Sequence, residues 1–323
     1  IYVVPWLFSY NTYNGFTPGL FLLNGFLPGY DKRSVGLNLM YDFKNNKPVG
    51  GLLLSKGFDQ IPFFHSGSWS LNIGTNAGRS GLHLGFNGTM KKPLSKSPIS
   101  KVDADIFYHN LNSDALDPEL YNSGEFVVAS IKLEKRWRPS IFKSYSISSQ
   151  IKMGNGFLKG SLNSGFTYRA SKKIKTSLSA GFGSFLVSNN IPLQYRYYLS
   201  GTVDPDFEQL VIDRMGGTSS DFKVLHNTYH GSGMRGIIVD STLSTDKMFW
   251  QIKIDQSLPV FPGNIFFDIA GSPGFGTQQY TAAGIELGPI IIPLYQSWEA
   301  DSTIPKDLDW FRNRIRLKIS ISL

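Results

Sequence analysis

The polar, glycine-rich stretch HNTYHGSGMRGIIVD, residues 226–240, contains the side chains that could do chemistry. His226 and His230 have the H-x3-H spacing that can hold zinc on a helix, and Ser232 is a hydroxyl between two glycines. The chain has no H-E-x-x-H motif and no G-x-S-x-G turn around a serine. We therefore expect no catalytic residue, no metal site and no cofactor, which leaves Arg235 as the residue to explain.

The composition excludes several classes of protein. The 323 residues include no cysteine, so disulfide frameworks and thiolate metal sites are excluded. The net charge is +8, but the acidic residues are interleaved with the basic ones. The one basic series, Arg312, Arg314, Arg316 and Lys318, has a spacing of two and therefore lines one face of a strand. We expect no nucleic-acid partner.

Alternation of apolar and polar residues with a period of two dominates the chain and predicts β-strands. At 35–43, for example, Val35, Leu37 and Leu39 share one face. The predicted strands are 2–10, 16–24, 34–43, 48–57, 66–76, 80–90, 101–110, 125–136, 143–153, 157–169, 173–187, 245–257, 263–271, 279–287, 290–298 and 310–322. We expect one domain over 1–323, in which 188–244 is the only long connection.

Two architectures produce this alternation, a soluble β-sandwich and a transmembrane β-barrel. The barrel is favoured because most predicted strands are near the roughly 9–11 residues that cross a bilayer, whereas strands in globular proteins are typically about 5–6 residues long. Polar faces rich in Gly, Ser and Asn suit a wet lumen, and aromatic residues gather near strand ends. The prediction is an all-β, antiparallel barrel of about sixteen strands in the outer membrane of a Gram-negative bacterium, with lipid as a partner. Segment 188–244 would be its sixth extracellular loop.

Two short motifs add a family resemblance. Met234-Arg235-Gly236-Ile237 resembles a [V/I/L]-R-G-[F/Y] motif, and Phe266-Phe267-Asp268-Ile269-Ala270 resembles an F-x-D-x-G motif. Ile237 stands where the first motif has an aromatic residue, and Ala270 stands where the second motif has glycine. The chain thus resembles the sixteen-stranded outer-membrane barrels of the superfamily that contains BamA, TamA and the two-partner secretion transporters. The resemblance places the first motif between strands eleven and twelve and the second on strand thirteen.

A physical reason connects the two motifs. If the 188–244 loop folds back into the lumen, Arg235 is partly removed from water, and Asp268 lies in an apolar setting on its strand. Each charge then needs a partner. We predict that Arg235 pairs with Asp268 and holds the loop to the wall; the alternative is two unrelated charges.

The first and last strands are a second candidate site. Pro5 removes one ladder donor from the first strand, and proline is mostly confined to edge strands or to first positions. In the resembled family these two strands form a seam that opens sideways. The resemblance therefore implies a seam that includes Pro5, Ile319, Ile321 and Leu323. The alternative is that Pro5 precedes the strand.

Three functions follow from these interpretations. The first is a barrel that inserts or translocates polypeptides at the outer membrane through the seam. Its partners would be polypeptide substrates and accessory outer-membrane or periplasmic proteins. The second is the membrane anchor or export barrel of a larger fused hydrolase, such as a peptidase. The third is a passive pore. We expect further sequence upstream of Ile1, a periplasmic domain for the first function and an enzymatic domain for the second.

Overall fold

The alternating segments form long antiparallel strands. The computed structural model describes residues 2–6, 10–11, 14–24, 33–76, 78–90, 98–115, 117–171, 173–201, 205–206, 233–237, 241–259, 262–275, 279–297 and 315–318. These residues form strands and short 3-10 turns, without an α-helix. None of the described segments is a helix long and apolar enough to cross a membrane. The predicted all-β, antiparallel class is confirmed.

The chain divides into two compact units. Residues 1–134, 151–155 and 213–217 belong to the first unit, and residues 135–150, 156–212 and 218–323 belong to the second.

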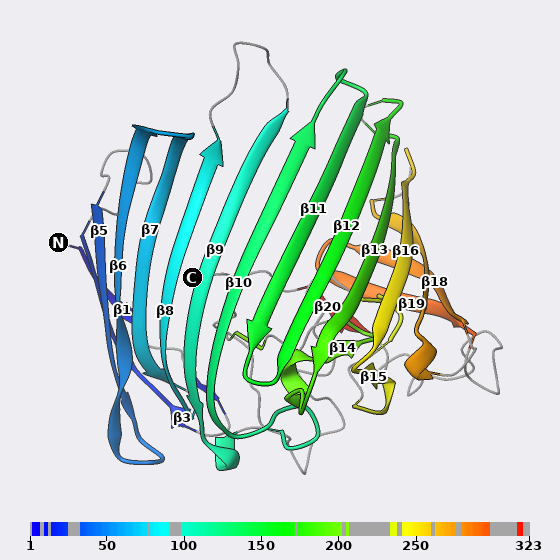
Figure 1. Ribbon diagram of the computed structural model, residues 1–323. Helices are drawn as coiled ribbons and strands as arrows, with labels where there is room; N and C mark the ends of the chain where they lie inside the picture. Colours follow the sequence, from blue (N-terminus) through cyan, green and yellow to red (C-terminus); the bar gives the residue numbers. More distant parts are fainter. Residues whose placement is uncertain are drawn as a thin grey trace. The chain divides into compact units, whose positions relative to one another are not determined.

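The first unit is a sheet in which sequence neighbours pair with one another. Its strands follow the order β1 (Tyr2–Trp6), β4 (Gly19–Asn24), β5 (Arg33–Asp42), β6 (Lys47–Ile61), β7 (Phe64–Asn76), β8 (Arg79–Met90), β9 (Ile99–Leu111) and most of β10 (Gly124–Trp137). Figure 1 shows β5 to β9 side by side as long strands. The ladders from β1 to β9 are antiparallel. A short hairpin joins β2 (Tyr10–Asn11) to β3 (Gly15–Phe16), and a 3-10 turn, η1 (Ser113–Ala115), follows β9.

The second unit is also a sheet of sequence neighbours. Its strands are most of β11 (Lys143–Gly154), β12 (Phe157–Arg169), β13 (Lys175–Ser188), β16 (Met248–Ser257), β17 (Asn264–Gly271), β18 (Gln279–Leu287), β19 (Ile290–Gln296) and β20 (Arg316–Leu317). The ladders from β12 to β20 are antiparallel. Between β13 and β16, strand β14 (Tyr197–Tyr198) pairs with β15 (Ser244–Thr245). The 3-10 turns are η2 (Leu193–Tyr195), η3 (Ser241–Leu243) and η4 (Pro273–Phe275).

Each predicted strand range overlaps a strand of these sheets, but some boundaries were wrong. The 16–24 range is interrupted: Phe16 pairs with Tyr10 in the hairpin, and β4 begins only after Pro18. The 245–257 range is also interrupted, because Thr245 belongs to β15. The Thr245 hydroxyl accepts a hydrogen bond from the Lys247 amide at 3.2 Å, and this local turn separates β15 from β16.

The two faces of the first unit differ as the alternation predicts. Large apolar side chains on one face of β5 to β10 are exposed: Val35, Leu39, Leu54, Trp69, Ile73, Leu84, Ile106, Val127, Ile131 and Leu133. We call this the apolar face. The opposite face of the same strands carries hydrogen-bonded polar groups, such as Ser34 with Ser55 at 2.5 Å and His83 with Asp105 at 2.9 Å. An exposed apolar face of this extent requires either an apolar partner surface or an apolar solvent.

The second unit has an exposed apolar face and a covered face. Ile252, Ile254, Ile265 and Phe267 point to the exposed face, each about 40% exposed. Along β18 the opposite positions Tyr280, Ala282, Gly284 and Glu286 are buried. The covering residues come from the long connection between β13 and β16, so the core of this unit lies between that connection and the sheet.

Candidate functional site

The short Arg235 segment, residues 233–237, lies against the covered face of the second unit. Its Met234 amide donates a 2.7 Å hydrogen bond to the Leu199 carbonyl, so the segment is attached to residues 193–201. Gly233 has a φ of +71°, and a Cβ there would lie 1.9 Å from the Gly201 nitrogen. Only glycine fits such a close approach in this backbone conformation.

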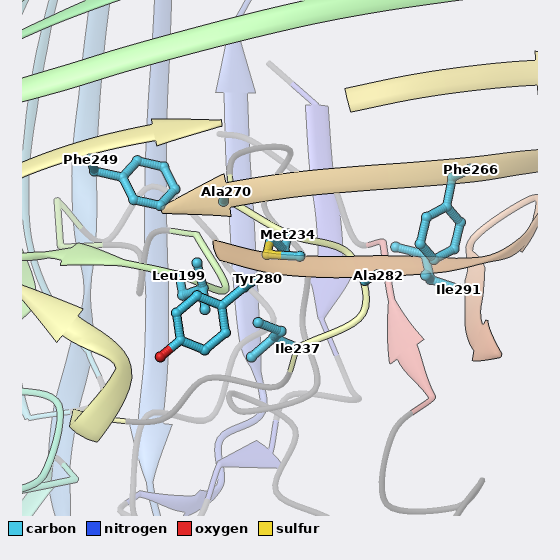
Figure 2. Packing of buried hydrophobic residues seen from close by; sticks show 9 residues of the cluster. All are labelled: Leu199, Met234, Ile237, Phe249, Phe266, Ala270, Tyr280, Ala282 and Ile291. Atoms are coloured by element: carbon cyan, nitrogen blue, oxygen red, sulfur yellow. The ribbon is translucent and has the colours of Figure 1, made fainter. Parts of the chain in front are cut away.

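Apolar packing holds the Arg235 segment on both sides of the arginine. Met234 and Ile237 are 0% and 3% exposed and belong to one buried cluster. Its members are Leu199, Met234, Ile237, Phe249, Phe266, Ala270, Tyr280, Ala282 and Ile291. Figure 2 shows these side chains gathered between the connecting segments and the strands of the sheet. Each fully buried side chain of the size of Met or Ile contributes about 1.5–3 kcal/mol.

The 193–201 segment is in turn fixed to β12. Lys159 Nζ donates to the Tyr195 carbonyl at 2.8 Å, and the Tyr197 hydroxyl donates to the Gly160 carbonyl at 2.9 Å. Burial raises the pKa of Tyr197 well above its ordinary value, so the phenol remains a donor at neutral pH. The Tyr197 ring stacks on Phe249 of β16, with centroids 6.1 Å apart. The connection is therefore attached to the sheet at two separate places.

The predicted ion pair between Arg235 and Asp268 is present. Arg235 Nε lies 3.2 and 3.1 Å from the two oxygens of the Asp268 carboxylate, and Arg235 Nη2 lies 2.5 Å from Oδ1. The Arg235 backbone amide also donates to Asp268 Oδ2 at 2.8 Å. The two side chains are 4% and 0% exposed. Asp268 thus accepts hydrogen bonds from both the side chain and the main chain of Arg235. These bonds fix the position of the segment and balance the charge of the arginine.

Further charged groups surround this pair. Arg235 Nη1 donates to Asp255, and it lies 3.5 Å from Glu286 Oε2. Glu286 also accepts from Lys318 Nζ at 2.8 Å, and Lys253 lies opposite Asp268 in the β16–β17 ladder. Arg235 thus has three carboxylates within reach, Asp255, Asp268 and Glu286, and Glu286 is shared with Lys318. These contacts satisfy the charges of Arg235 and Asp268, which would be costly to bury singly.

Phe266 and a small polar cavity complete the surroundings of Arg235. The guanidinium carbon lies 4.5 Å from the centre of the Phe266 ring, a cation–π geometry. The cavity, of about 250 Å³, is lined by charged and hydroxyl groups that include Lys175, Ser177 and Asn264. Within the described residues no group of three or more His, Asp or Glu side chains is placed to hold a metal ion. The arrangement is suited to holding a loop in place.

Gly236 is required because the segment and the sheet touch at this point. A Cβ on Gly236 would lie 2.6 Å from the Ala282 Cβ, and the Gln296 side chain donates to the Gly236 carbonyl. Ala282 is itself 0% exposed, so the sheet cannot yield without losing packing. The Arg-Gly pair therefore combines a charge anchor with a backbone contact.

Replacement of Gly236 by alanine is expected to destabilise the second unit by about 1–3 kcal/mol, the usual cost of overpacking. The reason is the 2.6 Å approach to Ala282. The measurement is the midpoint of urea unfolding in detergent. Gly160→Ala is the matched control, since a Cβ at Gly160 meets no atom within 4 Å. Equal midpoints for the two variants would contradict the prediction.

A second arginine, which the sequence did not single out as a partner of the loop, also holds the Arg235 segment. Arg316 of β20 is 0% exposed, and its Nη1 donates to the Met234 carbonyl at 2.8 Å and to the Ser200 carbonyl at 3.2 Å. It therefore joins both parts of the connection to the last described strand. The alternating basic series at 312–318 indicated one face of a strand, and Arg316 and Lys318 do contact neighbouring groups. No local sequence signal indicated which groups Arg316 would contact.

The remaining predicted residues fall into three groups. Phe266 and Ala270 are 1% and 0% exposed in the cluster beside the ion pair. Pro5 lies within β1, opposite Leu20 of β4, so the alternative that places it before the strand is wrong. Ile319, Ile321 and Leu323, and the candidates His226, His230 and Ser232, lie outside the described residues.

Comparisons with known proteins show a similarity in fold alone. No family model matches the chain, and no curated protein matches it. Among solved structures, the chain is similar in fold to BamA from Haemophilus ducreyi lacking POTRA domains 1-3, with 14% sequence identity and a TM-score of 0.41. The match covers 92% of this chain and 67% of that chain. Similarity at this level does not establish a shared function.

Proposed function

We propose that this chain is an outer-membrane β-barrel that inserts or translocates polypeptides through a seam between its first and last strands. The observation that carries the proposal is the buried Arg235–Asp268 pair, which fixes a segment of the long connection on the covered face of the sheet. Such a brace suits a wall that must open elsewhere without losing its internal support.

Burial on the two sheet faces supports the location in a membrane. The polar groups of the Arg235 network are covered, whereas large aliphatic and aromatic side chains on the other face are exposed. In water, an apolar face of this extent would cause aggregation, whereas lipid satisfies it. A passive pore or the anchor of a fused hydrolase would have the same apolar face. These two alternatives differ from the proposal in whether the seam must open.

The first strand supports the choice of seam. Pro5 lies within β1, Tyr2–Trp6, and has no amide hydrogen to donate to a ladder. The proline thus leaves the first strand one ladder hydrogen bond short, and each backbone hydrogen bond contributes about 1 kcal/mol.

Locking the seam is expected to stop polypeptide insertion. The chain has no native cysteine, so Val4→Cys can be combined with single cysteines along 315–322 and the pair that oxidises most readily selected. Proteoliposomes would receive a urea-denatured β-barrel polypeptide, and the protease-protected fraction would report insertion. We expect the oxidised protein to lose most of this activity and reductant to restore it.

Matched measurements separate the alternatives. Each single-cysteine variant, treated with the same oxidant, controls for chemical damage. A locked protein that inserts substrate at the unlocked rate would overturn the seam mechanism. A passive pore would conduct small solutes whether locked or not and would insert no polypeptide. A hydrolase domain encoded upstream of Ile1 would favour the anchor function.

A further inference from the structure

The apolar face of the first unit contains a groove whose volume is about 750 Å³. It lies across strands β5 to β10, and its surface is almost wholly apolar. The volume is within the roughly 300–1,000 Å³ of sites that hold small organic molecules. Ala104 and Ala129 are among its lining residues, and their small side chains leave the hollow between bulkier neighbours.

Two cross-strand rows of side chains form the groove. The register from β5 to β9 aligns Val35, Leu54, Leu71, Leu84 and Ile106 in one row. The adjacent row, two residues along each strand, consists of Arg33, Lys56, Trp69, Phe86 and Ala104. One row is thus purely aliphatic, and the other changes from two cations to two aromatic rings and a small residue.

The second row has the composition of a membrane interface. Trp69 is 56% exposed, and its ring centre lies 4.4 Å from that of Phe86. Phe86 in turn stacks on Phe58 at 5.7 Å. Aromatic residues of this kind gather where headgroups meet acyl chains. The aliphatic row beside it would then lie at the depth of the hydrocarbon.

Arg33 and Lys56 place two positive charges at one end of the groove. They are directly opposite in the β5–β6 ladder, and both are exposed. Basic side chains at a membrane surface attract anionic lipid headgroups, and two adjacent ones do so together. Asp105 also borders the groove, but its carboxylate is 2.9 Å from His83 Nε2 on the polar face.

We infer that this groove binds one anionic membrane lipid, with the phosphate at Arg33 and Lys56 and an acyl chain along the aliphatic row. The inference rests on the proposed membrane location. Charge complementarity selects an anionic lipid over a zwitterionic one, and the apolar hollow selects an acyl chain over a free phosphate. The aromatic pair Trp69–Phe86 continues the row of the two cations and lies beside the acyl chain.

Quenching of Trp69 by brominated lipids tests the site in the intact chain. The protein would be reconstituted in phosphatidylcholine vesicles, and lipid brominated on the acyl chain would be added as either phosphatidylglycerol or phosphatidylcholine. Because the chain has six tryptophans, the Trp69 signal is the difference between the unchanged protein and Trp69→Phe. We expect the anionic lipid to quench Trp69 at lower mole fraction than the zwitterionic lipid.

Variants of the groove provide the specific controls. Arg33→Gln/Lys56→Gln is expected to lower the preference for phosphatidylglycerol at least about fivefold. The reason is that each basic residue near an anionic lipid strengthens binding of that lipid about fivefold. Lys143→Gln/Lys173→Gln removes two exposed cations elsewhere and should leave the preference unchanged. Ala129→Phe fills the hollow without a charge change and should weaken quenching of Trp69 by the anionic lipid.

The outcomes separate the lipid site from the membrane location. Equal quenching by the two lipids, or a preference retained in Arg33→Gln/Lys56→Gln, overturns the site and leaves the membrane location intact. Quenching of the other tryptophans but not of Trp69 overturns the site in favour of a protein partner, such as a second copy of the chain. If neither lipid quenches any tryptophan, both the site and the membrane location are wrong.

Discussion

Asp268→Asn is expected to lower the free energy of unfolding of the second unit by about 3–5 kcal/mol, the cost of removing one partner of a buried ion pair. The substitution keeps the size of the side chain but leaves Arg235 and Lys253 on the same covered surface without the carboxylate between them. Asp255 and Glu286 remain near Arg235, but Glu286 is 3.5 Å away and is shared with Lys318. The measurement is the midpoint and slope of urea unfolding in detergent.

Asp255→Asn is the matched control for this prediction. It removes the same charge from a carboxylate that also contacts Arg235, but the Asp255 side chain is 31% exposed. Solvent screens the interaction of such a group, and we expect a cost of about 1 kcal/mol or less. If the two variants lose equal stability, the buried pair with Asp268 is not the main anchor.

The double variant Arg235→Met/Asp268→Leu separates the stability of the second unit from the attachment of the Arg235 segment. Apolar replacement of a buried ion pair is often neutral for folding, because neither partner is then left as an uncompensated charge. Most of the lost stability should therefore return. The hydrogen bond from the Arg235 amide to Asp268 does not return, so position 235 should exchange its amide hydrogen faster than in the unchanged protein.

The strands could be predicted because alternation is a local property of the sequence. Runs such as Val35, Leu37 and Leu39 reveal a strand with one apolar face wherever it lies in the sheet. Local turn chemistry was the source of error. Thr245 continues the alternation of β16 in sequence, but its hydroxyl accepts a hydrogen bond from the Lys247 amide and the strand is interrupted.

The ion pair could be predicted from the rule that a buried charge needs a partner, combined with the family resemblance. The other contacts of the site could not, because they join residues far apart in the chain. Arg235 reaches Glu286 over 51 positions, and Arg316 reaches Ser200 over 116. Which carboxylate or carbonyl lies beside each cation depends on register across several strands and on the path of the connection. No spacing within a single segment encodes that information.

Arg316→Met is expected to release the Arg235 segment from the last strand. Methionine keeps an apolar chain in the buried position but donates no hydrogen bond, so the carbonyls of Met234 and Ser200 lose a common donor. An acceptor left without a donor in a buried site costs about 1–3 kcal/mol. Hydrogen exchange followed by mass spectrometry should show faster exchange at 198–201, at 233–237 and at 316–317.

Lys318→Met is the control that distinguishes this contact from a general loss of positive charge on the strand. Lys318 lies two residues from Arg316 in sequence, and its side chain pairs with Glu286 at 2.8 Å but is 47% exposed. Removal of such a pair should cost about 0–1 kcal/mol and leave exchange at 233–237 unchanged. Equal exchange in the two variants would mean that Arg316 does not hold the segment. Faster exchange in Arg316→Met alone would show that Arg316 attaches the Arg235 segment to the last described strand, so that this strand and the segment form one support.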